Sequence, residues 1–440
     1  MLAKGMVIMM STCRELLEGL AQGKYDERLA HLYCCTGEGL LAQRGRVQAA
    51  IRRYEALFSA TEAAPAAVFS GPGRTELGGN HTDHQRGRVL AGAVNMDMLA
   101  VGAPNGSSKI RVQSEGYPVL TVDLGNLTPQ AGEQGRSEAL VRGVAACIAG
   151  RGYALSGFDA YITSSVPAGS GLSSSAAYEV LIGTILNHLY CGDALTAIEI
   201  AQIGQRAENE FFGKPCGLMD QMASAVGSAV AIDFADPAKP LVRKLDFDFT
   251  ACGYTLCIID SGADHADLTD EYAAITLEMG GVARALGKTV LREVDEGEFT
   301  RRIPALRKEL GDRAILRALH FFAEDRRAAE EAQALDDGDF EGFLALVRAS
   351  GISSALHLQN TYAAGNPRQQ AVPLAIAMAE QALDGAGAVR VHGGGFAGTI
   401  QAFVPNALLP VFQEKMEALL GKNMCHVLSI RPEGGCTLFD

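Results

Sequence analysis

The apolar residues of this chain recur at helical spacing in some stretches and form short continuous or alternating runs in others. The first sixty residues are predicted to be helical, because Ser11 or Thr12 can cap a first helix and residues 43–58 carry apolar side chains at helical intervals. The segment 61–67 breaks this pattern and leads into a short strand at 67–70. A helical segment therefore precedes the first strand.

Helices and strands alternate through the rest of the chain. A polar, glycine-rich segment at 71–88 follows the first strand. Further strands are predicted at 109–112, 119–124, 158–164, 255–260, 388–392, 399–404 and 425–430, and helices after residue 171, over 195–212, from 218 and over 407–420. Alternation in both halves predicts an α+β protein with two domains.

The predicted domains follow from this order of elements. Residues 1–62 form the N-terminal helical extension, residues 63–240 the N-terminal domain and residues 241–440 the C-terminal domain. The buried-type strand at 255–260 is expected to open the C-terminal domain. A length of 440 residues is enough for two such domains with cores of their own.

Composition narrows the functional classes. The chain has 38 Lys and Arg against 51 Asp and Glu, and its net charge of −13 disfavours a nucleic-acid-binding protein, which needs basic side chains to neutralise phosphates. Ten scattered cysteines with no CxxC pair favour a reduced cytoplasm over a disulfide scaffold. The apolar stretch 5–10 is too short to cross a membrane. We therefore expect a cytoplasmic protein with a small-molecule partner and neither a nucleic-acid nor a membrane partner.

The strongest chemical signal lies between a predicted strand and a predicted helix. The segment there reads Pro167-Ala-Gly-Ser-Gly-Leu-Ser-Ser-Ser-Ala176. Its glycines allow the backbone to approach a ligand closely, and its serines lie at a helix N-terminus, where N–H groups and the helix dipole favour a phosphate. A glycine-serine turn with a serine cap is the structural alternative, but three serines at the start of a strongly amphipathic helix favour phosphate binding.

Two other nucleotide-binding patterns fit less well. A dinucleotide fingerprint would need glycine where Ser174 stands, and the acidic Asp193 lies between two helices instead of closing a strand. The sequence Gly287-Lys288-Thr289 resembles a P-loop, but the first glycine of that motif would fall on Val282, in a stretch that is polar and helix-like.

A second polar segment follows the first strand. It reads Gly71-Pro-Gly-Arg-Thr-Glu-Leu-Gly-Gly-Asn-His-Thr-Asp-His84 and concentrates groups that hydrogen-bond the hydroxyls of a sugar or polyol. A metal site at His81, Asp83 and His84 is an alternative, although the spacing matches no known zinc pattern. The third interpretation of this segment is a polar surface loop without a ligand.

A third group of polar residues surrounds a predicted helix start. Glu208 lies in one helix, and Asp220 and Gln221 follow in Gly217-Leu-Met-Asp-Gln-Met-Ala-Ser224. Asp220 lies among apolar residues and opens a helix. Taken alone, it reads as an acid stabilised by the helix dipole.

Together, these segments resemble those of the GHMP small-molecule kinases, most closely the galactokinase branch. The matching segments, in order, are 74–90, 167–176, Glu208-Asn-Glu-Phe with Pro215-Cys-Gly-Leu-Met-Asp-Gln221, Arg317-Ala-Leu-His320 and Gly393-Gly-Gly-Phe-Ala-Gly398. The similarity covers residue 63 to the C-terminus. It implies two α+β domains, with ATP and sugar bound between them, in a monomer or small homo-oligomer.

The resemblance also implies roles for individual residues. Asp220 would be the base or charge partner near the attacking hydroxyl, and Arg74 would stabilise charge around it and the transferring phosphoryl group. Ser175 and Glu208 would hold Mg²⁺. Asn80, His81, Asp83 and Tyr272 would bind the sugar. The residues that would wrap the triphosphate are Pro167, Gly169, Ser170, Gly171, Leu172, Ser173, Ser174 and Ser175.

The implied reaction is transfer of the γ-phosphate of ATP to the anomeric hydroxyl of galactose. The chain departs from the family on the sugar side, with Asn80 and His84 where galactokinases carry Glu and Tyr, and with an altered segment at 363–368. We expect Asn80 to lower the preference for galactose and His84 to be a donor that can be protonated near neutral pH. Another or a modified aldose as substrate, or a non-catalytic sugar sensor, are the alternatives.

Overall fold

The computed structural model describes residues 10–58, 61, 63–167, 170–263 and 268–440. Its α-helices are α1 (Cys13–Ala21), α2 (Asp26–Tyr33), α3 (Gly37–Phe58), α4 (Ser137–Ala149), α5 (Ser174–Leu186), α6 (Ala197–Ala207), α7 (Met219–Val226), α8 (Thr269–Ala285), α9 (Glu296–Leu310), α10 (Asp312–Asp336), α11 (Phe340–Ser353), α12 (Ala371–Leu383) and α13 (Leu409–Leu420). Its strands are β1 (Ala67–Gly78), β2 (Arg88–Pro104), β3 (Lys109–Ser114), β4 (Leu120–Asp123), β5 (Phe158–Ser164), β6 (Ala229–Asp233), β7 (Leu241–Lys244), β8 (Tyr254–Asp260), β9 (Ala388–Val391), β10 (Thr399–Pro405), β11 (Cys425–Leu428) and β12 (Cys436–Phe439).

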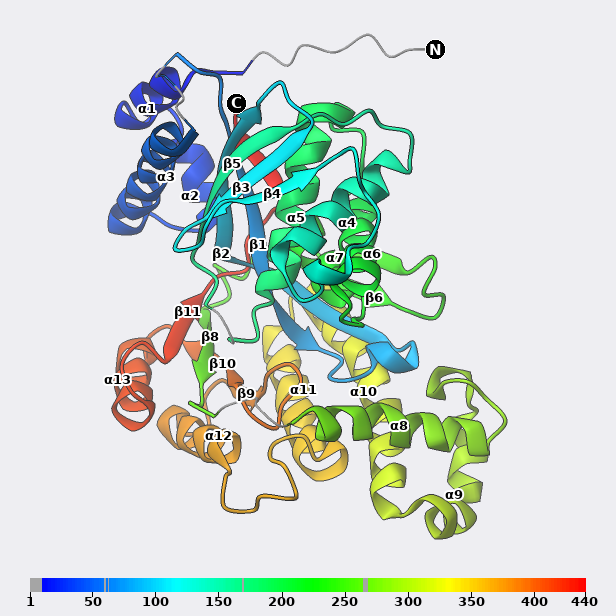
Figure 1. Ribbon diagram of the computed structural model, residues 1–440. Coiled ribbons are helices and arrows are strands. Elements are labelled where there is room, and N and C mark those ends of the chain that lie inside the picture. The colour runs from blue at the N-terminus through cyan, green and yellow to red at the C-terminus, as the bar shows by residue number, and fades with distance from the viewer. Residues whose placement is uncertain (1–9, 59–60, 62, 168–169, 264–267) are drawn as a thin grey trace.

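The larger sheet has the strand order β12-β1-β2-β5-β3-β4, and β6 and β7 continue it from one end of β2. Helices cover both of its faces: α1–α3 lie on one side and α4–α7 on the other (Figure 1). Successive residues of β1 therefore enter different cores, with Phe69 facing α5 and Val68 facing the N-terminal helices. This double burial explains why the central strands are apolar throughout.

The N-terminal extension is helical, as predicted. Thr12 caps α1 in a reciprocal capping box with Glu15, which confirms one of the two caps expected from the sequence. The apolar side chains of α1–α3 are buried against the back of the larger sheet, where Leu16, Ile51 and Leu99 share one core. The extension is therefore packed as part of the sheet's core.

The smaller sheet has the order β11-β8-β10-β9, and all of its strand pairs are antiparallel. One face packs on α12 and α13. The other face shares a core with α11 and with β1 and β2 of the larger sheet, through residues such as Phe343, Phe403 and Leu77. Helices α8–α10 form a further core beside it (Figure 1). The mixed two-domain α+β architecture agrees with the prediction.

Strand β1 is longer than the sequence indicated. It continues through Gly78, so Arg74 lies on a strand and not in the polar loop that was expected. The glycines misled the prediction, because they serve close packing here: a Cβ atom on Gly71 would lie 2.5 Å from the carbonyl oxygen of Ala177, in α5. Irregular register between Pro72 and Arg74 bends the strand further.

The chain crosses between the two sheets more than once. β7, at 241–244, pairs with β6, and β12, at 436–439, pairs with β1, so both belong to the larger sheet. A domain boundary at residue 240 would assign β7 and β12 to the C-terminal domain, although both strands complete the larger sheet. Among the described helices, none is both long and apolar enough to span a membrane.

Candidate active site

The turn that follows β5 has the expected strand–turn–helix geometry. Ser173 stands at the N-cap of α5 with left-handed dihedrals (φ 55°), and among the described residues its side chain caps none of the helix N–H groups. The N-terminus of α5 is thus open to an anionic ligand. Gly169 lies outside the described residues.

A cavity of about 300 Å³ lies at this turn and gathers residues from four separate segments. Arg74 comes from β1, Asp220 from the first turn of α7, and Glu208 from the end of α6. The rest of the lining consists of Pro167, Ser170, Gly171, Leu172, Ser173, Ser174, Ser175, Lys214 and Cys216. All the described residues expected to take part in catalysis, triphosphate binding and metal binding therefore line one cavity.

Arg74 and Asp220 form a bidentate ion pair in this cavity. Arg74 Nε donates to Asp220 Oδ1 at 2.7 Å and Nη2 donates to Oδ2 at 2.6 Å, while Nη1 donates to the carbonyl oxygen of Gly171. Burial of the Asp220 carboxyl opposes ionisation, but the charge and hydrogen bonds of Arg74 outweigh it and hold the pKa of Asp220 below its usual range. The carboxylate is charged and oriented, yet 31% of its side chain is exposed to the cavity.

Glu208 begins a π-helical turn, Glu208–Phe212, at the end of α6. Such turns widen a helix locally and can re-aim a side chain. The nearly buried Glu208 carboxylate accepts a hydrogen bond from Gln221 Nε2 at 2.9 Å and lies 3.7 Å from Lys214 Nζ. Gln221 Nε2 also donates to Glu179 at 2.9 Å, and burial together with the charge of Glu208 raises the pKa of Glu179 to about 9. Glu179 is thus neutral at pH 7.

The donors present suit Mg²⁺. Ser175 offers a hydroxyl and Glu208 a carboxylate, both hard oxygen ligands, and the remaining positions would fall to phosphate oxygens and water. Among the described residues, no group of three or more His, Cys, Asp or Glu side chains is placed to hold a metal by itself. This disfavours the alternative of a metal site at His81, Asp83 and His84.

Three of the four residues expected on the sugar side, Asn80, His81 and Tyr272, contact the turn at 393–395. His81 Nε2 contacts the carbonyl oxygen of Gly394 at 2.9 Å, and the Tyr272 hydroxyl donates to the carbonyl oxygen of Gly395 at 2.8 Å. The fourth, Asp83, lies against the segment that leads into α7, since a Cβ atom on Gly217 would lie 2.5 Å from Asp83 Oδ2. Asp83 is therefore close to the segment that precedes Asp220.

Asn80 occupies a different place from the one expected. It is fully buried, its amide group donates to Glu76 Oε1 at 3.0 Å and to the carbonyl oxygen of Gly393 at 2.7 Å, and its oxygen accepts from Asn360 at 2.9 Å and from Ser354 at 3.3 Å. All four of its hydrogen-bonding positions are used. These contacts give Asn80 a structural role, and the expected contact between Asn80 and the sugar stays a prediction.

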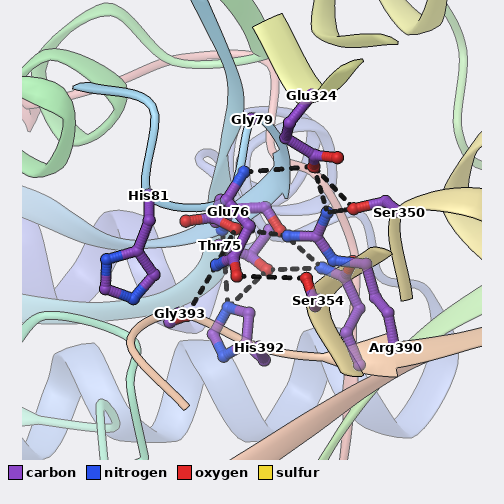
Figure 2. Close-up of polar contacts among 12 residues, drawn as sticks. Thr75, Glu76, Gly79, His81, Glu324, Ser350, Ser354, Arg390, His392 and Gly393 are labelled. Atoms are coloured by element: carbon purple, nitrogen blue, oxygen red, sulfur yellow. Dashed lines mark hydrogen bonds and ion pairs between the residues drawn. The ribbon is translucent and has the colours of Figure 1, made fainter. Parts of the chain in front are cut away.

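Asn80 instead belongs to a buried polar cluster that joins the two sheets. Arg390, at β9, pairs with Glu76 of β1 and donates to Ser350 Oγ at 3.0 Å, while Glu324 accepts from Ser350 Oγ at 2.6 Å and from the Asn80 backbone at 3.2 Å. Figure 2 shows these side chains converging, with the His81 ring standing apart from them. Burial raises the pKa of Glu76 to about 7 against the opposing charge of Arg390.

Sequence reasoning missed this buried cluster. Glu76 stood in the polar segment without an assigned role. Its ion-pair partner, Arg390, lies 314 residues away in the sequence, so no local pattern could reveal the pair. Burial lowers the pKa of His84 to about 4, which disfavours the expected protonation of this ring near neutral pH. An uncharged ring beside His81 offers the sugar side no cation there.

Comparison with known proteins agrees with this geometry. Residues 139–228 match the GHMP kinases N terminal domain, and residues 52–104 match the galactokinase galactose-binding signature. The structure resembles Lactococcus lactis galactokinase complexed with galactose, at 25% sequence identity and a TM-score of 0.72, covering 87% of this chain and 97% of that one.

More distant structures share the fold alone. Methanococcus jannaschii mevalonate kinase is 14% identical with a TM-score of 0.58, covering 82% of this chain and 98% of its own. Streptococcus pneumoniae phosphomevalonate kinase in complex with phosphomevalonate and AMPPNP is 13% identical with a TM-score of 0.56, covering 82% of this chain and 99% of its own.

Proposed function

This chain is a member of the GHMP kinase family, and on that premise we propose that it transfers the γ-phosphate of ATP to the anomeric hydroxyl of galactose. The observation that carries the proposal is the single cavity lined by Arg74, Asp220, Glu208 and the serines before α5. Phosphoryl transfer needs positioning and charge neutralisation more than covalent chemistry, and these residues are the parts that it requires.

The proposed role of each residue follows from its position in the cavity. The N–H groups at the start of α5 and the hydroxyls of Ser173–Ser175 would hold the phosphates. Arg74, already directed into the cavity, would neutralise charge on the transferring phosphoryl group. Asp220 would orient the attacking hydroxyl and accept its proton late in the transfer, because a carboxylate paired with arginine is a weak base.

Members of this family use ATP and Mg²⁺, and Ser175 and Glu208 are the proposed ligands of the metal. When bound, Mg²⁺ would neutralise negative charge on the phosphates. Gln221 would keep the Glu208 carboxylate directed toward the cavity through its hydrogen bond.

Galactose is proposed as the sugar on two grounds. The galactose-binding signature covers the segment that carries His81 and Asp83, and the similar Lactococcus lactis enzyme was solved with galactose. The sugar would lie near Asp83, His81 and Tyr272, with its anomeric hydroxyl toward Asp220.

The test is an ADP-release assay of the full chain with Mg²⁺ and ATP over a panel of aldoses, 2-substituted galactoses and C6-modified galactoses. We expect galactose to give the highest kcat/KM and a product phosphorylated at C1, identified by phosphorus NMR. A higher kcat/KM for another sugar would assign that sugar instead. Binding of sugar and ATP without ADP release would identify a sensor and contradict the proposed reaction.

The Glu208→Gln variant tests the proposed metal ligand. We expect the Mg²⁺ concentration for half-maximal activity to rise at least about ten-fold, since even outer hydrogen-bond partners of metal sites cost 10–100-fold in affinity when removed. Glu210→Gln is the matched control, because Glu210 lies two residues away and pairs with Arg206 at the surface. A rise in the sugar KM with an unchanged Mg²⁺ requirement would exclude Glu208 as a metal ligand.

A further inference from the structure

The N-terminal extension reaches the strands that carry the phosphate loop, defined here by its described residues, 167 and 170–175. Arg46, on α3, donates from Nη1 to Asp97 Oδ1 at 2.6 Å, and from Nη2 to the carbonyl oxygens of Asp97 at 3.1 Å and Thr163 at 3.4 Å. Asp97 lies on β2 and Thr163 on β5, which pair with each other. One guanidinium group thus joins the adjacent strands where β5 nears its end.

The next contact is at the start of the phosphate loop. The N–H of Ser165 donates to the carbonyl oxygen of Asp97 at 2.9 Å, and the N–H of Asp97 donates to Ser165 Oγ at 2.9 Å. Ser165 is two residues before Pro167. A later part of the loop is held separately, because the N–H of Arg74 donates to the carbonyl oxygen of Leu172 at 3.0 Å. The start of the loop is therefore held through Asp97, which Arg46 contacts, and Leu172 is held by Arg74.

The contact between Asp97 and Ser165 depends on the N-terminal extension, because the extension supplies partners to the Asp97 carboxylate. It is fully buried, and it accepts from Tyr33 of α2 at 2.8 Å, from Arg46 of α3, and from Ser70 of β1, with Arg431 at 3.7 Å. A buried carboxylate needs such partners to stay charged. Two of them come from residues 1–62, so the extension supplies both a hydrogen bond and a countercharge to the point where the loop begins.

We propose that Arg46 is a positioning residue for the phosphate loop, so that the N-terminal extension sets the affinity of the enzyme for ATP. This inference rests on the proposed function, because it takes the phosphate loop as the triphosphate site. Arg46 acts through Asp97 and Ser165 and touches no reacting group. Small displacements of groups that position a substrate can change rates by up to about a hundred-fold, so a looser start to the loop is expected to weaken ATP binding.

The experiment compares Arg46→Gln, Arg46→Lys and wild type in the full chain, with the Kd of Mg-ATP measured by calorimetry and the KM values of ATP and sugar measured by ADP release. We expect Arg46→Gln to raise the Kd and KM of ATP about ten-fold while the sugar KM stays within two-fold. Arg46→Lys keeps the charge beside Asp97 but loses the planar fork, so its ATP Kd should fall between the two.

Arg44→Gln is the matched control. Arg44 lies two residues away on α3, has a similarly buried side chain, and pairs with Asp26 inside the extension. The thermal stability of the Arg44→Gln variant is expected to fall while its Kd for ATP stays unchanged. An equal weakening of ATP binding in Arg44→Gln and Arg46→Gln, or no weakening in Arg46→Gln, would overturn the inference.

Two further results keep the test decisive. If Arg46→Gln does not fold, Tyr33→Phe removes the other contact from the extension to Asp97 while keeping the ring, and it should raise the ATP Kd in the same direction. An unchanged Kd in both Tyr33→Phe and Arg46→Lys would then overturn the inference. Failure of the wild type to bind Mg-ATP would contradict the proposed function itself.

Discussion

Replacing Asp220 with asparagine is expected to lower kcat by a factor of about 10²–10⁴, the range associated with a group that assists proton transfer and orients charge in the transition state. The amide keeps the shape of the carboxylate but can neither accept the proton of the sugar hydroxyl nor hold Arg74 through two charged hydrogen bonds. ATP binding should not weaken, because the change removes a negative charge from a cavity proposed to hold phosphates.

The measurement is kcat for ADP release together with the Kd of Mg-ATP for the variant. Asp26→Asn is the control, since it removes the acid of another two-pronged arginine–aspartate pair, with Arg44, far from the cavity. We expect the control to lose stability and to keep its kcat. If Asp220→Asn retains more than about a tenth of the wild-type kcat, Asp220 does not have the proposed role.

Replacing Asn80 with glutamate is expected to destabilise the fold by roughly 3–5 kcal/mol, the cost typical of an uncompensated buried charge. The new carboxylate would be fully buried, next to Glu76 Oε1, and the hydrogen bond to the carbonyl oxygen of Gly393 would be lost. This reverses the expectation from sequence, in which a glutamate at position 80 improves galactose recognition.

The loss of stability should depend on pH. A buried acid whose pKa is raised in the folded state is protonated there at acid pH, so the destabilisation is smallest below the pKa of the unfolded chain and grows as the pH rises. Burial already raises the pKa of Glu76 to about 7, and a second carboxylate beside it would act in the same direction. The difference in unfolding free energy from wild type should therefore be larger at pH 8 than at pH 5.

Chemical denaturation of wild type, Asn80→Glu and Asn80→Gln at both pH values measures this effect. Asn80→Gln adds one methylene without a charge, so it separates overpacking from charge burial. We expect Asn80→Gln to show a smaller loss that does not change with pH. An Asn80→Glu protein as stable as wild type, with an improved galactose kcat/KM, would restore the view that position 80 contacts the sugar.

The parts of the site that could be predicted are those formed by a short, continuous stretch of sequence. The phosphate loop combines glycines, serines and the start of an apolar helix within ten residues, and the structure keeps that arrangement. Arg74 and Asp220 are 146 residues apart, and only the resemblance to a kinase family linked them. Their direct ion pair agrees with that link.

The parts that could not be predicted depend on contacts between distant segments. Glycines in β1 resembled loop residues, although they allow the strand to lie close to α5. The surroundings of Asn80 come from β1, α10, the π-helical turn at 354–358 and the turn after β9, so its burial could not be predicted from the neighbouring sequence. A polar residue in a functional motif can bind the ligand or hold the motif together, and burial decides between the two.

The pairing of β1 with β12 has a consequence for how the protein is made. Residues 67–70 are synthesised long before residues 436–439, yet they are neighbours in the larger sheet. Until β12 leaves the ribosome, this edge of β1 has unpaired N–H and C=O groups, and exposed strand edges favour association between chains. Chaperone binding during the synthesis of the segment between these strands would therefore protect the nascent chain from aggregation.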